Sequence, residues 1–143
     1  MAITQTLTNV FKQDCLDGAQ NLGNGGDTIK IALYTSDATL NASTTAYTTS
    51  NEASGTGYTA GGTTLSSQSV TLDTSNGVAF FDAADPSFSS ATITARGALI
   101  YNNSKSNAAI AVLDFGSDFS SSNGTFQIQF PTAAHNTALI RIS

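Results

Sequence analysis

The residues best suited to acid–base or nucleophilic chemistry in this 143-residue chain are one histidine and one cysteine. His135 stands in the polar stretch PTAAHNTA, with no recognisable nucleophile context and no G-x-S-x-G elbow in the chain. We therefore interpret it as a solvated turn histidine. Cys15 falls on an apolar stripe and is expected to be a small buried hydrophobe rather than a reactive thiol. One histidine and one cysteine cannot assemble the usual zinc ligand set or an internal disulfide. The sequence predicts a protein that is not an enzyme.

Two pairs of aspartates are the remaining candidates for chemistry. Asp82 and Asp85 lie in FFDAADP, and Asp114 and Asp118 lie in LDFGSDF. Two carboxylates together with loop carbonyls can hold Ca²⁺, but the twelve-residue EF-hand pattern is missing. Aspartate at a strand end is normally a turn former, because its side chain bonds nearby backbone groups. We expect no cofactor and no resident metal, and a cation at these four positions stays open.

The composition excludes several classes of partner. Only 10% of the residues are charged, against about 25% in ordinary domains. The net charge is −5 and the five basic residues are scattered, which argues against nucleic acid. No apolar run approaches the ~20 residues of a membrane span, and the N-terminal stretch lacks the pattern of a signal peptide. A surface poor in charge is typical of a chain that packs against copies of itself or a partner.

The hydrophobic pattern predicts one helix followed by six to eight strands. Residues 4–20 carry apolar side chains at three- and four-residue spacing, with Thr4 or Thr6 as the cap and NLGNGG as the stop. From TIKIALY onward the period is two. The remaining strands are predicted in SSQSVTLD, VAFFD, ATITARGALIY, AAIAVLDF, TFQIQF and ALIRIS.

Turn signals separate these strands at intervals of about 8–12 residues, which predicts an antiparallel β-sandwich or barrel. Asn76-Gly77 indicates a hairpin with a type I′ turn, and AAIAVLDF is expected to be a central strand buried on both faces. The predicted fold is mainly β and jelly-roll-like, a single domain over residues 1–143 with one N-terminal helix.

Residues 35–64 interrupt the strand pattern with a long stretch rich in serine and threonine. Its large apolar residues are Leu40, Tyr47 and Tyr58. Loops longer than ~12–15 residues are uncommon in compact domains and are usually functional or disordered. Three anchors and β-tolerant threonines favour order. We expect an extended arm that gains its order from a neighbouring subunit and makes most inter-subunit contacts.

Several blocks of the chain resemble a group of small proteins encoded by tailed bacteriophages. The resemblance rests on GGDTIKIALYTSDATLNASTTAYTTSNEASGTGYTAGGTTL, ATITARGALIYNNSKSN, AVLDFGSDFSSSNGTFQIQFP and the terminal ALIRI. It implies a virion structural protein, assembled in the bacterial host cytoplasm, and offers no catalytic residues to transfer. The resemblance leaves the position in the particle open.

Small size, low charge and a sandwich with a long extended segment favour a capsid decoration (cement) protein bound to the major capsid protein. The alternative is a tail or head–tail connector protein, which can also be a small β-rich domain with a long loop. A homo-oligomer is expected, a trimer on the head or a hexamer in the tail. A second alternative is a carbohydrate-binding module that stacks sugars on the tyrosines. These are Tyr34, Tyr47, Tyr58 and Tyr101.

Overall fold

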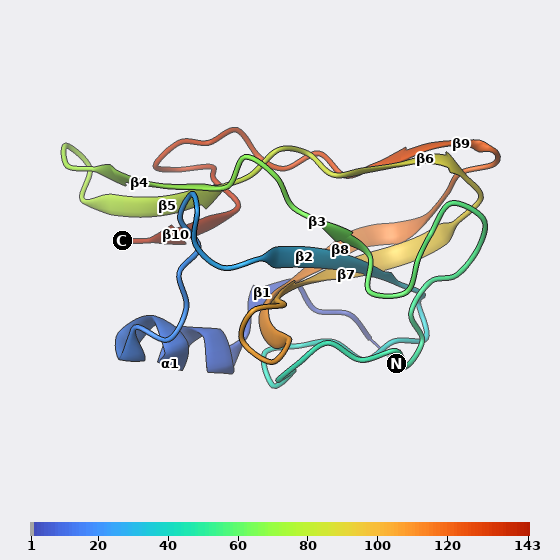
Figure 1. Ribbon diagram of the computed structural model, residues 1–143, viewed down its shortest axis with the longest axis horizontal. Helices are drawn as coiled ribbons and strands as arrows, with labels where there is room; N and C mark the ends of the chain where they lie inside the picture. Colours follow the sequence, from blue (N-terminus) through green and yellow to red (C-terminus); the bar gives the residue numbers. More distant parts are fainter. Residues whose placement is uncertain (1) are drawn as a thin grey trace.

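The computed structural model describes residues 2–143 and shows two layers of antiparallel strands with one short helix (Figure 1). The prediction of a mainly β, sandwich-like fold is therefore confirmed. The main sheet has the spatial order β1 (Thr6–Leu7), β8 (Ala108–Ser120), β7 (Thr94–Asn102), β2 (Ile29–Tyr34) and β3 (Thr63–Thr64). The second layer holds a three-stranded sheet of β10 (Ile140–Ile142), β5 (Val78–Asp82) and β4 (Ser69–Asp73), and a two-stranded sheet of β6 (Ser87–Ala91) and β9 (Gly124–Gln127).

The centre of the main sheet, formed by β2, β7 and the start of β8, is buried on both faces. The period of two in β2 sends Ile29, Ile31 and Leu33 into the core between the two layers, and Ala32 and Tyr34 into a second core on the opposite face. The nearly continuous apolar run at the start of β8 has the same cause, because β8 lies between β1 and β7 and contributes to both cores. The predicted burial on both faces holds for residues 109–112, while residues 113–115 of the predicted strand are only half-buried.

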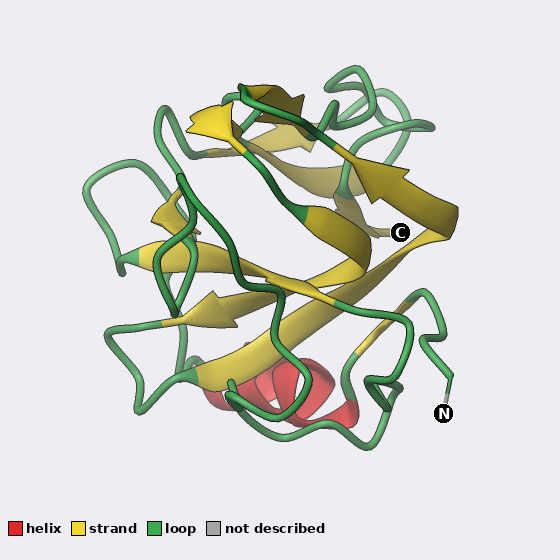
Figure 2. Ribbon diagram, turned by 90° about the vertical axis from the view of Figure 1, so that its right-hand side faces the viewer, coloured by secondary structure: helices red, strands yellow, loops and turns green. Residues whose placement is uncertain are grey.

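The second core is closed by chain segments rather than by a sheet. Figure 2 shows loops and the helix on this side of the main sheet. Ala38 and Leu40 are buried against it, and Tyr47 and Val10 pack at its margin. A short parallel bridge between Ile3 and Leu40 ties the N-terminal residues to the same cover.

The helix is shorter than predicted. The chain first pairs with β8 as β1, and α1 spans only Asn9–Asp17. Thr8 caps the helix in place of Thr4 or Thr6. Its buried hydroxyl accepts from the Phe11 N–H at 3.3 Å and donates to the Ala109 carbonyl at 2.9 Å. Gly18, at φ 67°, ends the helix before the predicted stop.

Three strand predictions also need correction. Asn76-Gly77 does not form a type I′ turn, because only Gly77 of the pair has a positive φ and the loop spans four residues between Asp73 and Val78. The predicted strand AAIAVLDF ends at Phe115, yet β8 continues to Ser120. Strand β6 was not predicted at all, since serines fill three of its five positions.

Candidate functional site

The predicted arm, residues 35–64, folds back onto its own chain. Leu40 is only 1% exposed. Its carbonyl accepts from the Thr4 N–H at 2.9 Å, and its N–H donates to the Ala2 carbonyl at 3.1 Å. Tyr47 and Tyr58 are half-buried. The three anchors thus pack the segment against the main sheet of its own chain. The inter-subunit role of the segment stays a prediction, which exposed residues other than Leu40 would have to carry.

All four tyrosines of the chain gather where this segment meets the main sheet. The rings of Tyr47 and Tyr101 stack with centroids 4.9 Å apart and an interplanar angle of 19°. The Tyr34 hydroxyl donates to the Thr48 carbonyl at 2.6 Å, and the Tyr101 hydroxyl donates to the Gly61 carbonyl at 2.7 Å. Tyr34 and Tyr101 are buried. Two of the tyrosines considered for stacking on sugars are therefore turned inward.

Glu52, the only glutamate of the chain, lies at the centre of this cluster. Its carboxylate accepts hydrogen bonds from the Tyr47 hydroxyl, the Tyr58 hydroxyl and the Gly61 N–H, each at 2.7 Å. The Tyr58 hydroxyl in turn accepts from the Leu33 N–H at 2.9 Å. One carboxylate thus joins two parts of residues 35–64 to β2. Sequence reasoning missed Glu52, although a lone glutamate between two tyrosines in a bland stretch was an available signal.

Burial raises the pKa of each of the four tyrosines above the ordinary value of 10.0. At Tyr47 and Tyr58 the hydrogen bond to the Glu52 carboxylate raises it further, because that bond needs the protonated phenol. The unfolded chain therefore loses these protons first as the pH rises. Below pH 10.0 the tyrosines are protonated in both states, and their contribution to the free energy of unfolding is complete. Above pH 10.0 the unfolded chain loses protons that the folded chain keeps, so the free energy of unfolding falls.

We expect the free energy of unfolding to be level up to about pH 10 and to decrease steeply above it. Urea unfolding followed by circular dichroism at a series of alkaline pH values measures this. Tyrosinate absorbance should rise together with unfolding rather than before it. Tyrosinate forming in the folded protein near pH 10 would contradict the prediction.

His135 and Cys15, the other two candidates for chemistry, do not lie in a common site. The His135 ring lies 3.6 Å from the Asp73 carboxylate and its side chain is 41% exposed, in line with a turn histidine. Cys15 is exposed rather than buried, which corrects the prediction, because α1 turns Cys15 away from the core and buries only Phe11. Leu16, predicted on the same apolar stripe, is 91% exposed.

Two of the aspartates considered for a cation, Asp114 and Asp85, bond to groups of the chain itself. The Gly116 N–H bonds Asp114 at 2.9 Å and Arg96 lies 3.2 Å away, and together they lower the pKa of the Asp114 carboxyl. Asp85 accepts from the Phe130 N–H at 2.9 Å. Within residues 2–143 no three His, Cys, Asp or Glu side chains are grouped as metal ligands would be. No helix in the same range is long and apolar enough to cross a bilayer.

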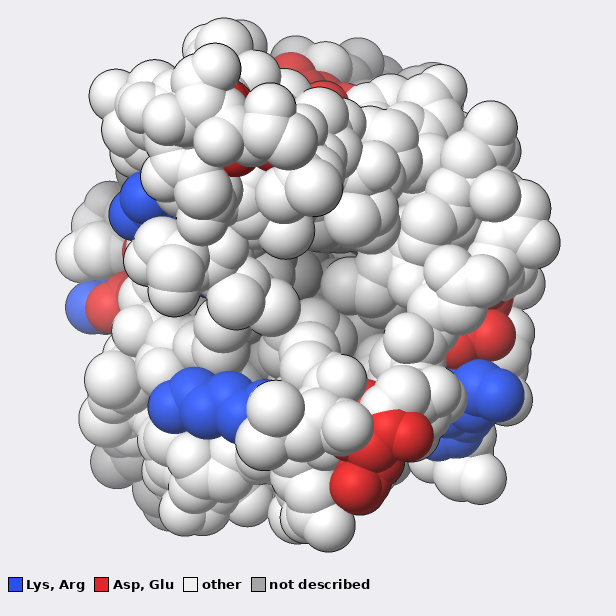
Figure 3. Space-filling view, turned by 90° about the vertical axis from the view of Figure 1, so that its left-hand side faces the viewer, with Lys and Arg blue, Asp and Glu red and all other residues white. Residues whose placement is uncertain are grey.

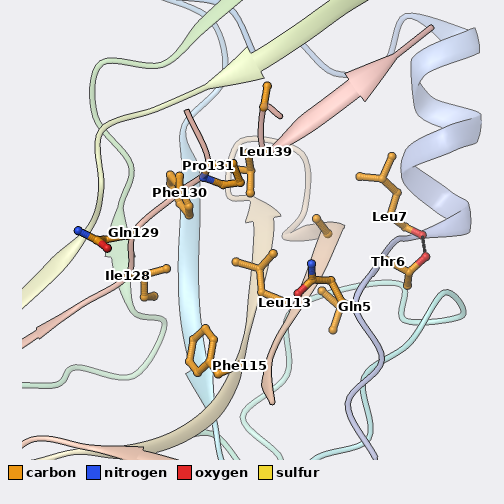
Figure 4. Close-up of a pocket in the computed structure, with 13 residues that line it drawn as sticks. Gln5, Thr6, Leu7, Leu113, Phe115, Ile128, Gln129, Phe130, Pro131 and Leu139 are labelled. Atoms are coloured by element: carbon orange, nitrogen blue, oxygen red, sulfur yellow. Dashed lines mark hydrogen bonds between the residues drawn. The ribbon is translucent and has the colours of Figure 1, made fainter. Parts of the chain in front are cut away.

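An apolar cleft of about 380 Å³ opens along one edge of the sandwich (Figure 4). Strand β1 pairs only with Ala111 and Val112 of β8, so that beyond Val112 this edge of β8 has no partner strand among the described residues. The Asp114 N–H there donates to the Gln5 side chain at 3.1 Å. Leu113 and Phe115 of β8 face Ile128, Phe130 and Leu139 across the cleft (Figure 4).

The cleft continues along β8. A second hollow of about 400 Å³ shares Phe115, Ile128 and Gln129 with the first and reaches Phe119, whose side chain is 51% exposed. The aromatic ring of Phe119 lies edge-on to that of Phe115, with centroids 6.3 Å apart. An open strand edge beside an apolar cleft is the arrangement to which an extended segment of a partner can add.

No protein-family model, curated protein or solved structure matches this chain.

Proposed function

We propose that this chain is a non-enzymatic virion structural protein of a tailed bacteriophage, and that it is a capsid decoration protein. The proposal starts from the resemblance of its sequence blocks to phage proteins. The observation that carries it further is the apolar cleft beside the open edge of β8. A structural protein needs such surfaces, since apolar side chains and free backbone groups bind an extended segment of a neighbour. The partner proposed for it is the major capsid protein.

In this proposal an extended segment of a capsid subunit lies along β8 beyond β1. Leu113, Phe115 and Phe119 would supply the apolar contacts. Backbone hydrogen bonds to β8 would require the Asp114 N–H to exchange the Gln5 side chain for the partner. The low charge of the chain suits this mode, because few charged groups lose water on contact. The tail or head–tail connector alternative uses the same surface with another partner. Copy number separates the two, since decoration requires hundreds of copies per particle.

Substitution of Phe119 by aspartate is expected to weaken binding to capsid shells that lack this protein by at least tenfold, roughly 1.4 kcal/mol. The exposed side chain leaves folding intact, while a carboxylate in the cleft opposes apolar contact. Co-sedimentation of purified protein with such shells measures the effect. Leu16→Asp is the matched control, because Leu16 is also exposed but lies on α1.

The Leu16→Asp variant should bind as the unchanged protein does. If the unchanged protein fails to sediment with the shells, the decoration assignment is wrong. If Phe119→Asp binds normally, the assignment survives but the cleft is not the contact surface.

A further inference from the structure

Strand β4 is an open and unprotected edge of the second layer. It is the outer strand in the order β10-β5-β4, and the β4–β5 hairpin reaches beyond the main sheet (Figure 1). Val70 is 54% exposed and Leu72 is 66% exposed. Proteins usually protect such edges with proline, lysine or a bulge. SVTLD has neither residue, and its ladder with β5 runs without a register shift.

The exposed side chains of β4 belong to a wider apolar face. Paired residues on neighbouring strands share a face, so that Val70 lies beside Phe81 and Leu72 beside Ala79. On the far side of β5, Ala79 pairs with Ile142, which is 55% exposed.

A hollow of about 380 Å³ lies under this face, with Phe11 and Cys15 of α1 on its opposite wall. On this side of the molecule Figure 3 shows a hollow whose walls lack charged side chains, with Lys, Arg, Asp and Glu only around it. The apolar character therefore extends from the edge strand across the sheet.

We propose that two copies of this chain join through β4, antiparallel about a two-fold axis at Thr71. The two three-stranded sheets then form one continuous sheet of six strands. Thr71 faces Thr71 of the second copy, and Val70 faces Leu72 of that copy. The pairing uses all five residues of β4 and continues the apolar face across the axis.

The charges of the strand favour a second copy as the occupant. Asp73 is the only charged residue of β4, and in this register it faces Ser69 of the other copy, so that no carboxylate opposes another. The other edge of the sheet, β10, has only three residues and carries Arg141. Pairing of β4 with β10 would therefore match fewer residues. The inference depends on β4 alone and not on the proposed phage function.

Cysteine crosslinking tests the axis directly. In a Cys15→Ser background, Thr71→Cys places two thiols on directly opposed residues, whose Cα atoms are about 4.5–5.5 Å apart in an antiparallel pair. That spacing is within the range of a disulfide. Ser69→Cys is the control on the same strand. In the proposed register residue 69 of one copy opposes Asp73 of the other, so the two introduced thiols lie four residues apart along the strands, about 13 Å. Under mild oxidation Thr71→Cys should give a covalent dimer on a non-reducing gel, and Ser69→Cys should not.

Light scattering after size exclusion gives the second measurement. The unchanged protein should have twice the 14.6 kDa mass of one chain, and Leu72→Lys should return it to the mass of one chain. Phe119→Lys, an equally apolar site on β8, should remain dimeric. A single-chain mass for the unchanged protein at all concentrations would overturn the proposal. Equal crosslinking of the two cysteine variants, or a Leu72→Lys dimer, would also overturn it. If Leu72→Lys fails to fold, the crosslinking decides.

Discussion

Replacement of Gly62 by alanine is expected to lower the free energy of unfolding by more than about 4 kcal/mol, or to prevent folding. Gly62 has a φ of +78°, and a Cβ there would overlap the carbonyl oxygen of Ile31. The same Cβ would lie 2.6 Å from the Ile31 carbonyl carbon and 2.8 Å from the Ala32 Cα. These are backbone atoms of β2 at the centre of the fold, so they cannot move aside without disturbing the main sheet.

Gly61 provides a control at the neighbouring position. Its φ is +96°, so alanine there is also strained, but the nearest atom to a Cβ is the Tyr101 hydroxyl at 3.4 Å. Gly61→Ala should therefore cost only the conformational strain, about 1–2 kcal/mol. Urea unfolding of both variants gives the comparison. A similar loss for the two would mean that close approach to β2 is not what makes Gly62 necessary.

The strands of the main sheet could be predicted from the sequence because burial on a strand leaves a simple pattern. The alternation in TIKIALY arises because successive side chains of β2 enter the two different cores, with Ile29, Ile31 and Leu33 in the core between the layers. The apolar run at the start of β8 follows from a strand with neighbours on both sides. Both patterns are local consequences of a position in the sheet, and for that reason the type and the start of each strand could be predicted, although β8 ends five residues after the predicted strand AAIAVLDF.

The missed features depend on contacts between distant parts of the chain. Strand β6 has three serines, and only its pairing with β9 and the burial of Phe88 make it a strand. The helix begins at Asn9 because β1 pairs with β8, about a hundred residues away. Residues 35–64 carry little pattern of their own, since they cover a sheet face whose shape is set by Tyr34, Leu99 and Tyr101.

The open edges of β4 and β8 could not be found from the sequence either. Both SVTLD and GSDFS have the composition of an ordinary strand or loop. Their significance arises from the sheet order, which leaves one side of each without a neighbour among the described residues. Edges are properties of topology, and a single sequence gives the order of elements along the chain but not in space.

Glu52→Ala is expected to lower the free energy of unfolding by about 2–4 kcal/mol. The substitution removes one carboxylate that accepts three hydrogen bonds at 2.7 Å, and bonds to charged acceptors contribute about 1.5–3 kcal/mol each in protected sites. Glu52 is only half-buried, so water offsets part of that sum. The Tyr58 hydroxyl would keep its bond from the Leu33 N–H but would lose its acceptor.

Glu52→Gln should cost about half as much, because its amide can replace the carboxylate only in part. The amide oxygen can still accept from the Tyr58 hydroxyl and the Gly61 N–H, and the amide nitrogen can donate to the Tyr47 oxygen. Asp37→Ala is the control, since this exposed carboxylate lies in the same segment, and it should stay within about 0.5 kcal/mol of the unchanged protein. Urea unfolding of the three variants should show Glu52→Ala as the least stable, Glu52→Gln as intermediate and Asp37→Ala as the most stable. If Glu52→Ala unfolds like the control, the apolar anchors alone hold residues 35–64 in place. The hydrogen bonds to Glu52 would then be a consequence of the position of that segment and not its cause.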